Sequence, residues 1–229
     1  MERLKHSCAW SGYWCYEPGN RRTGEMRVRQ ITSKFILIAI WGIVPLAAAG
    51  AAEYHVDTTA PRMVKFTSKA PLENFDGTTS RIDGYAVTPF DTLRAGTGYD
   101  SSKFYFEVDL NALDTGIGLR NRHMRENYLE TDRFPFSQFA GRISEAGRAA
   151  DSAFHLTIAG DMTIHGVQKP KSATIQAAKE GSRYHVRGQF PVALPDYKIK
   201  VPRLMFLKIS DTVQVQLDFY LLPAAAAKD

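Results

Sequence analysis

The polar side chains with the clearest chemical potential form a basic cluster near the middle of the sequence. Arg120, His123 and Arg125 lie close together in the chain. Arginine donates bidentate hydrogen bonds to phosphate or carboxylate groups, so these three residues are candidates for a rim that meets the polar or anionic head of an amphiphile. The alternative is structural, because charges at helix ends are commonly solvated. In that case Arg120 and His123 would tie a helix to a neighbouring turn through Asp114 or Asp132.

The remaining reactive residue types do not form a recognisable catalytic or metal-binding pattern. Both cysteines, Cys8 and Cys15, lie near the start of the chain. The histidines after residue 52 show no HxH or HxxxH spacing, so a metal site would need ligands that converge from distant segments. The sequence also lacks the GxSxG, Walker and GxGxxG motifs. We therefore expect no catalytic residue, no metal and no covalent cofactor.

The start of the chain resembles an export signal. Residues 26–52 begin with basic side chains, continue through the apolar run Phe35 to Leu46 and end in small residues, which is the layout of a cleaved secretory signal peptide. The apolar run is shorter than the roughly 20 residues that span a bilayer. We expect residues 1–25 to be a mis-assigned N-terminal extension, with translation starting at Met26, and we expect the mature protein to be exported.

The charge of the whole chain is a poor guide to its partners. The formal net charge is +5 and the pI is about 9.2, but the basic excess falls mainly in residues 1–52. The rest of the chain is nearly balanced, so we expect no nucleic-acid partner. Because no cysteine follows residue 52, this part can fold in an oxidising compartment without disulfides.

The rest of the sequence alternates between apolar and polar residues, which indicates strands with one buried face. From this pattern we predict one antiparallel domain of about eight strands over residues 53–223, followed by a disordered tail at 224–229. A single short helix is expected within Asp114 to Asp132, where the alternation stops. Periodicity alone is compatible with both a β-sandwich and a closed β-barrel. The clearest alternating stretches are 64–68, 81–87, 104–110, 154–159, 184–192 and 213–221.

Three segments carry a family resemblance. The first is Tyr-His-Val-Asp at 54–57, followed by Phe-Asp-Gly at 75–77. The second runs from Leu-Asp-Thr-Gly at 113–116 through Arg-Asn-Arg-His-Met-Arg to Phe-Pro-Phe-Ser-Gln-Phe at 134–139. The third is Gly-Asp-Met-Thr-Ile-His-Gly-Val-Gln-Lys-Pro at 160–170. In order and spacing these segments resemble the YceI family of exported, lipocalin-like proteins.

The resemblance implies both a fold and a ligand class. The implied fold is all-β, an extended antiparallel eight-stranded lipocalin-like barrel with one short helix. The implied ligand is a long isoprenoid chain, carried by a polyprenyl lipid or a ubiquinone-like quinone, and in some relatives a fatty acid or amide. The resemblance also implies a periplasmic location and often a homodimer, and it implies no catalytic residue.

Within such a barrel, a set of apolar side chains is expected to line the interior and bind the ligand. In a barrel without a ligand the same side chains would simply form the core, and alternation does not separate these two interpretations. The expected lining residues are Phe66, Phe104, Phe106, Val108, Met124, Phe154, Leu156, Ile158, Leu217 and Phe219.

These observations favour a periplasmic carrier or store for an isoprenoid-type lipid. One alternative is an accessory protein that holds quinone for a membrane cytochrome or another inner-membrane partner in electron transfer. A third class is an enzyme acting on an amphiphile. An enzyme would need a polar pair inside the cavity with perturbed protonation.

Overall fold

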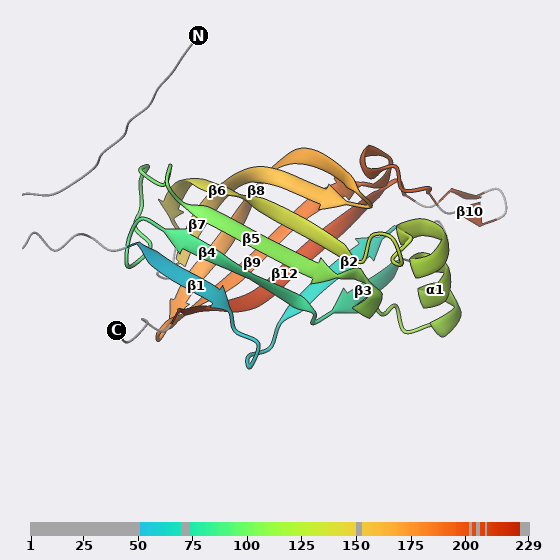
Figure 1. Ribbon diagram of the computed structural model, residues 1–229, viewed down its shortest axis with the longest axis horizontal. Helices are drawn as coiled ribbons and strands as arrows, with labels where there is room; N and C mark the ends of the chain where they lie inside the picture. The colour runs from blue at the N-terminus through green and yellow to red at the C-terminus, as the bar shows by residue number, and fades with distance from the viewer. Residues whose placement is uncertain are drawn as a thin grey trace, which may run out of the picture. The chain divides into compact units, whose positions relative to one another are not determined.

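The alternating segments form strands of a closed antiparallel barrel and of a hairpin beside it in the computed structural model (Figure 1). Eight strands complete the ring in the order β1-β4-β5-β6-β7-β8-β9-β12, and β12 pairs back with β1. The expected eight-stranded barrel with one short helix is therefore confirmed. The ring strands are β1 (Ala52–Val56), β4 (Ile82–Thr88), β5 (Lys103–Asp109), β6 (Phe136–Arg148), β7 (Ala153–Ile164), β8 (Val167–Glu180), β9 (Arg183–Ala193) and β12 (Thr212–Pro223).

The structure describes residues 51–69, 74–149, 153–201, 203–204, 207–208 and 210–224. All of these residues belong to one unit, 46–229. The predicted N-terminal extension, nearly all of the predicted signal peptide and the predicted tail beyond Ala224 lie outside the described residues.

An additional hairpin lengthens the barrel wall beside β12. β2 (Met63–Ser68) pairs with β12 and with β3 (Phe75–Thr79). β12 pairs with β2 through its first half and with β1 through its last residues. β1 and β2 thus pair with successive parts of the same side of β12, and the loop at residues 57–62 separates them.

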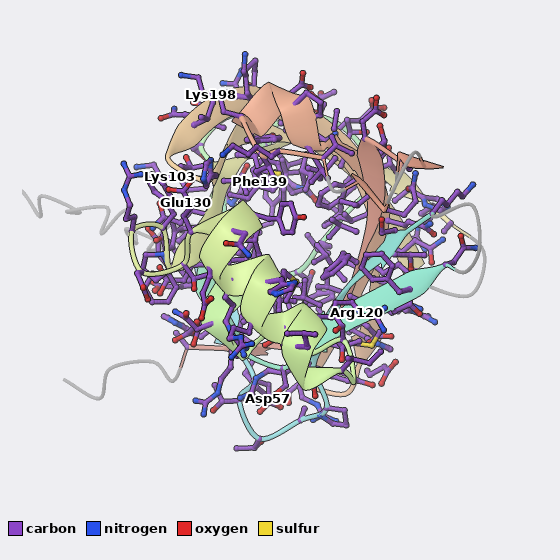
Figure 2. The ribbon with its side chains drawn as sticks, turned by 90° about the vertical axis from the view of Figure 1, so that its right-hand side faces the viewer. Asp57, Lys103, Arg120, Glu130, Phe139 and Lys198 are labelled. Atoms are coloured by element: carbon purple, nitrogen blue, oxygen red, sulfur yellow. The ribbon has the colours of Figure 1, made fainter. Side chains whose placement is uncertain are left out.

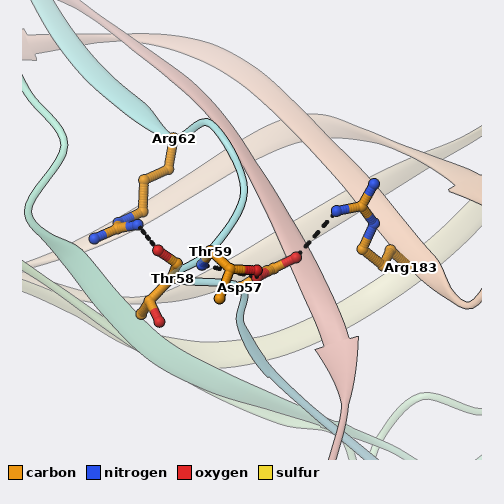
Figure 3. A network of polar contacts seen from close by, with 5 residues as sticks. All are labelled: Asp57, Thr58, Thr59, Arg62 and Arg183. Carbon is orange, nitrogen blue, oxygen red and sulfur yellow. Dashed lines mark hydrogen bonds and ion pairs between the residues drawn. The ribbon is translucent and has the colours of Figure 1, made fainter.

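A buried carboxylate holds this loop in place (Figure 3). Asp57 is 2% exposed and accepts hydrogen bonds from the backbone N–H and the hydroxyl of Thr59, at 2.9 and 2.6 Å. Arg183 lies 3.1 Å from its other oxygen, and Arg62 donates to the Thr58 carbonyl. The Thr59 hydroxyl holds the pKa of Asp57 below its usual value of 3.8, against the opposing effect of burial.

The short elements gather at one end of the barrel. They are η1 (Leu110–Ala112), α1 (Gly118–His123), the π-helical turn η2 (Met124–Leu129), η3 (Leu194–Tyr197), and the paired strands β10 (Arg203–Leu204) and β11 (Leu207–Lys208). α1 and β10 lie at the same end in Figure 1. The helix expected within residues 114–132 is confirmed as α1 with η2. No helix in the described part of the chain has the length and apolar character needed to cross a bilayer.

The middle of the barrel depends on a close approach of two strands. Gly141 on β6 faces Gly160 on β7. A Cβ on Gly160 would lie 2.1 Å from the Ala140 carbonyl oxygen, and one on Gly141 would lie 2.2 Å from the Ala159 carbonyl oxygen. No side chain fits at either position, so glycine allows β6 and β7 to pass close together there. A register shift follows in β6, where the bulge re-aims its side chains.

Candidate functional site

The barrel encloses an elongated apolar cavity of about 850 Å³. This volume falls within the roughly 300–1,000 Å³ typical of small-molecule sites. Aliphatic and aromatic side chains from every ring strand form most of its lining. Among the described residues that line it, the basic ones are Arg120, His123 and Lys200, and none is Asp or Glu. The cavity can therefore accept a long apolar group without burying an unpaired carboxylate.

An aromatic cluster forms the middle of the cavity wall. The ring centroids of Phe104 and Phe139 are 5.0 Å apart, and those of Phe106 and Phe219 are 5.4 Å apart. Figure 2, which looks in from the end that carries α1, shows Phe139 pointing into the barrel interior. The Phe104–Phe139 pair packs edge to face and the Phe106–Phe219 pair is tilted, and such contacts fix the positions of the rings.

The end of the cavity opposite α1 is closed by two tyrosines and a loop. The hydroxyl of Tyr54 donates to the Asp91 carbonyl at 2.8 Å, and the Tyr184 hydroxyl accepts from Leu93 N–H at 3.0 Å. The two rings pack edge to face at 5.4 Å. Burial, with the nearby Tyr184, raises the pKa of Tyr54 to about 12. Tyr54 therefore stays a protonated donor at neutral pH and keeps the loop fastened over this end.

The other end of the cavity is a mouth bordered by α1 and by the segment after η3. Leu119, Arg120 and His123 line it from the helix, and Ile199 and Lys200 line it from the opposite side. Figure 2 shows the helix lying across this end, with Arg120 beside the opening. All the charged side chains of the lining therefore lie at the mouth rather than deep in the barrel.

A buried asparagine holds α1 in this position. The Asn121 amide donates to Asp114 at 2.6 Å and accepts from the Thr115 backbone N–H at 2.8 Å and its hydroxyl at 2.7 Å. The hydrogen bond from Asn121 also lowers the pKa of Asp114. Arg125 adds a hydrogen bond to the Asn111 carbonyl at 2.9 Å. Asn121 and Arg125 thus connect α1 and η2 to the segment that precedes them.

Arg120 and His123 have a different setting from Arg125. The guanidinium of Arg120 lies 4.8 Å from the centre of the Phe75 ring, a cation–π geometry. Among the described residues, neither Arg120 nor His123 pairs with a carboxylate. Asp114, one of the expected partners of these side chains, is engaged by Asn121 instead. Both basic groups therefore remain available to a molecule at the mouth.

His165 connects three loops around the mouth. Its Nδ1 lies 3.2 Å from the Tyr197 carbonyl, and its Nε2 lies 3.3 Å from a Glu130 carboxylate oxygen. The ring packs against Phe134 at 4.7 Å. Glu130, His165 and Lys198 have φ values of 45°, 51° and 57°, an unusual left-handed conformation for residues other than glycine. Backbone strain is therefore concentrated where the helix, the β7–β8 turn and η3 meet.

The structure brings nearly all the predicted lining residues together in one cavity. The exception is Phe154, which is 8% exposed but is not part of the lining. It lies at the start of β7, and Arg148 lies 5.9 Å from its ring. Of the predicted head-group rim, Arg120 and His123 line the mouth and Arg125 does not. The predicted residues that line the cavity are Phe66, Phe104, Phe106, Val108, Met124, Leu156, Ile158, Leu217 and Phe219.

Several residues of the site were missed by sequence reasoning. Lys200 follows a short 3-10 turn and belongs to no periodic segment, so nothing local indicates that it reaches the mouth. Phe139 belongs to the second family segment, but the small residues Ser137 and Gly141 interrupt the apolar alternation around it in β6. Tyr54 was visible only as part of the first family segment and Tyr184 only as a strand residue, because their partners in the β4–β5 loop are distant in sequence.

The cavity lining and its surroundings contain no recognisable metal centre among the described residues. No group of three or more His, Cys, Asp or Glu side chains in that part of the chain is arranged to hold an ion. His185 contacts two carboxylates, and it lies 2.6 Å from Asp218 and 3.1 Å from Glu180. These contacts connect β9 to its neighbours β8 and β12, and His185 is not part of the cavity lining.

Comparison with known protein families gives one matching domain. The model of the YceI-like domain matches residues 54–221. A UPF0312 protein of Shewanella putrefaciens is 30% identical over 182 residues, which cover 73% of this chain and 88% of the relative. A UPF0312 protein of another Shewanella strain is 29% identical over 185 residues, covering 76% of this chain and 88% of the relative.

Solved structures show the same fold at low sequence identity. A polyisoprenoid-binding domain from Saccharophagus degradans aligns with a TM-score of 0.56 and 17% identity, covering 76% of this chain and all of the domain. BcnA from Burkholderia cenocepacia aligns with a TM-score of 0.55 and 16% identity, covering 72% of this chain and 98% of BcnA. At this identity the two matches support the barrel architecture.

Proposed function

Because this chain belongs to the YceI family, we propose that it binds an isoprenoid-type lipid, either a polyprenyl lipid or a quinone, with the apolar chain inside the barrel. The observation that carries the proposal is the apolar cavity of about 850 Å³, which opens at the end bordered by α1. The domain of Saccharophagus degradans that shares the fold is a polyisoprenoid-binding domain, which supports a ligand of this class here.

The affinity would come mainly from removing the lipid chain from water. Burial of about ten methylene groups at about 0.8 kcal/mol each contributes about 8 kcal/mol. Association costs at least about 4 kcal/mol in lost freedom of motion, so a chain of several isoprene units leaves a surplus. The lining offers shape and apolar surface, and it needs few polar contacts to retain such a chain.

The head group would lie at the mouth. Arg120, His123 and Lys200 are the charged groups of the described lining, and no Asp or Glu accompanies them there. This composition favours a head that accepts hydrogen bonds or carries negative charge, such as a phosphate, a carboxylate or a quinone carbonyl. The tail would extend towards Tyr54 and Tyr184 at the closed end.

We further propose that the protein works in the periplasm as a carrier or store. The support is the signal-peptide layout of residues 26–52. Cell fractionation, with detection of the mature N-terminus by mass spectrometry, tests this location. A cytochrome partner in the inner membrane and a homodimer stay predictions.

The ligand is tested by native mass spectrometry of protein purified without detergent, followed by organic extraction. We expect a bound species with the mass of a polyprenyl lipid or quinone, released on denaturation. A protein that carries no lipid and also fails to take up added polyprenol or ubiquinone would contradict the proposal.

A further inference from the structure

The end of the barrel that carries the mouth also presents exposed apolar side chains. Ile117 and Leu119 are 51% and 56% exposed, which makes them the most exposed large apolar side chains among the described residues. Both also line the cavity, so they lie at its lip. Neighbouring exposed apolar side chains with a polar border are a feature of surfaces that contact another molecule or a membrane.

The same short segment is strongly basic. Between Ile117 and Arg125 the chain has three arginines and a histidine and no Asp or Glu. Arg122 is exposed, and within the described structure it takes part in no ion pair. Arg125 donates to two backbone carbonyls and lies close enough to Asp114 to help lower the pKa of that carboxyl, so its charge is partly balanced. Apolar side chains and unpaired positive charge therefore coincide on α1.

A second segment at this end, after the start of η3, also carries exposed basic side chains. The β10–β11 hairpin projects beyond the barrel wall at the end that carries α1 (Figure 1). Lys198 and Lys200, which precede it, are exposed. The positive charge of this end thus extends over two separate elements.

We propose that α1, through Ile117, Leu119, Arg120, Arg122 and His123, docks the mouth of the barrel onto an anionic lipid bilayer. We call these five residues the docking surface. Amphipathic segments with basic and apolar faces bind in the interfacial region of membranes, and each arginine near an anionic leaflet adds electrostatic attraction. The docked orientation opens the cavity towards the lipid rather than towards water.

A bilayer fits this surface better than a protein partner does. A stable protein interface buries about 800 Å² on each partner, whereas the exposed apolar part here consists of two side chains. Shallow insertion into a membrane requires only a few apolar groups when arginines contact the phosphates around them. Docking goes beyond the proposed ligand, since it concerns the contact between the mouth and a membrane rather than the occupant of the cavity. The passage of a lipid from bilayer to cavity rests on the proposed function.

The test is flotation of the purified full-length mature protein with lipid vesicles. One set of vesicles contains phosphatidylcholine alone, and the other contains equimolar phosphatidylcholine and phosphatidylglycerol. We expect the protein to float with the anionic vesicles, and we expect added salt to weaken this binding because the charges are exposed. Absence of flotation with anionic vesicles at low salt would overturn the proposal.

Matched variants locate the contact. Arg122→Gln is expected to lower partitioning into anionic vesicles about five-fold, and Arg122→Glu about 25-fold, from the energy of one basic residue at such a surface. Arg142→Gln is the control, because Arg142 is also exposed but lies on the β6 wall. Leu119→Ser is expected to cost about five-fold through lost apolar contact. Equal losses in Arg122→Gln and Arg142→Gln would show an unspecific charge effect and overturn the proposed surface.

Failure of docking and failure of the ligand proposal give different results. Arg122 does not line the cavity, so the Arg122→Glu variant should retain pre-bound lipid in detergent-free solution as the wild type does. It should nevertheless take up polyprenol from anionic vesicles more slowly. Normal flotation without lipid uptake would remove the carrier function and leave docking intact, whereas uptake at the wild-type rate in Arg122→Glu would contradict docking.

Discussion

The interior and the mouth of this barrel differ in their secondary structure and in the chemistry of their side chains. The interior is walled by a closed ring of eight antiparallel strands, and its middle is an aromatic cluster around Phe104 and Phe139. The mouth is made of short helical pieces, carries the basic residues of the lining and contains all three described non-glycine residues with positive φ. The comparison suggests a division of roles, in which the interior supplies affinity and the mouth controls access and head-group choice.

The two regions also differ in how readily they can open. Removing a ring strand would break hydrogen-bond ladders on both of its sides, so the wall should open only with global unfolding. Moving α1 requires loss of the Asn121 contacts and of the His165 contact to Glu130. Opening at the mouth is therefore the lower-energy route for exchange of a bound lipid.

The largest expected effect is a charge placed on the interior side of the wall. Leu156→Asp puts a carboxylate in the cavity, whereas His155→Asp puts one on the exposed outer face of the same strand. We expect Leu156→Asp to lower lipid affinity at least about 100-fold, because an unpaired buried charge costs several kcal/mol. His155→Asp should leave affinity within about two-fold, since surface changes are usually small. Titration with polyprenol by intrinsic tyrosine fluorescence, with circular dichroism as a folding check, measures both.

If both variants bound lipid equally well, the ligand would not lie in the barrel.

The next effect concerns the stability of the wall. Asp57→Ala removes the buried partner of Thr59 and Arg183, and we expect it to destabilise the protein by about 2–3 kcal/mol. Because the folded-state pKa of Asp57 is lowered, its contribution is full above the ordinary pKa of an aspartate and is lost as the pH falls through the lowered value. Urea unfolding between neutral pH and about pH 3 should therefore show a smaller acid loss in Asp57→Asn than in the wild type.

An equally steep acid loss in Asp57→Asn would show that other carboxylates control the acid sensitivity of the wall.

A smaller effect should appear when the helix at the mouth is released. Asn121→Ala removes hydrogen bonds to Asp114 and Thr115, and we expect it to speed dissociation of bound lipid about ten-fold, which corresponds to about 1.4 kcal/mol. Asn111→Ala is the control, because only the backbone of Asn111 takes part in the described contacts. Stopped-flow transfer of a fluorescent polyprenol to acceptor vesicles measures the rate. An unchanged rate would mean that lipid leaves by a route that does not require α1 to move.

The smallest effect is expected from the head-group side chain itself. Arg120→Gln keeps the hydrogen-bonding ability of the side chain but removes its charge, so it should weaken binding of a polyprenyl phosphate about five-fold. Binding of the uncharged polyprenol should stay nearly unchanged. Competition between the two lipids gives the ratio directly. An equal loss for both lipids would indicate a packing role on Phe75 rather than recognition of an anion.

The interior was largely predictable from sequence, because strand periodicity is a local property. Residues such as Phe104, Phe106 and Leu156 were placed on the inner face by alternation alone, and closure into a barrel followed from the family resemblance. Alternation gives the face of a residue but not its depth along the barrel. Phe154 shares the inner face of β7 with Leu156, yet it lies at the closed end outside the cavity.

The mouth was less predictable, because its contacts join segments that are far apart in the chain. The basic cluster was visible, but its division into the lining residues Arg120 and His123 and the tie formed by Arg125 depends on the helix orientation. Lys200 reaches the mouth through η3, and His165 meets Glu130 across 35 positions. Secondary-structure propensity and hydrophobic periodicity do not predict such contacts between distant segments.

The most direct test of the division of roles is photo-crosslinking with an isoprenoid that carries a diazirine at the end of its tail. After irradiation, protease digestion and mass spectrometry locate the labelled peptides. We predict labels on inward-facing residues of the wall, such as Phe104, Phe139 and Leu156, and their loss when unlabelled polyprenol competes. Labels confined to the outer face of the barrel or to α1 would contradict binding of the lipid chain inside the barrel.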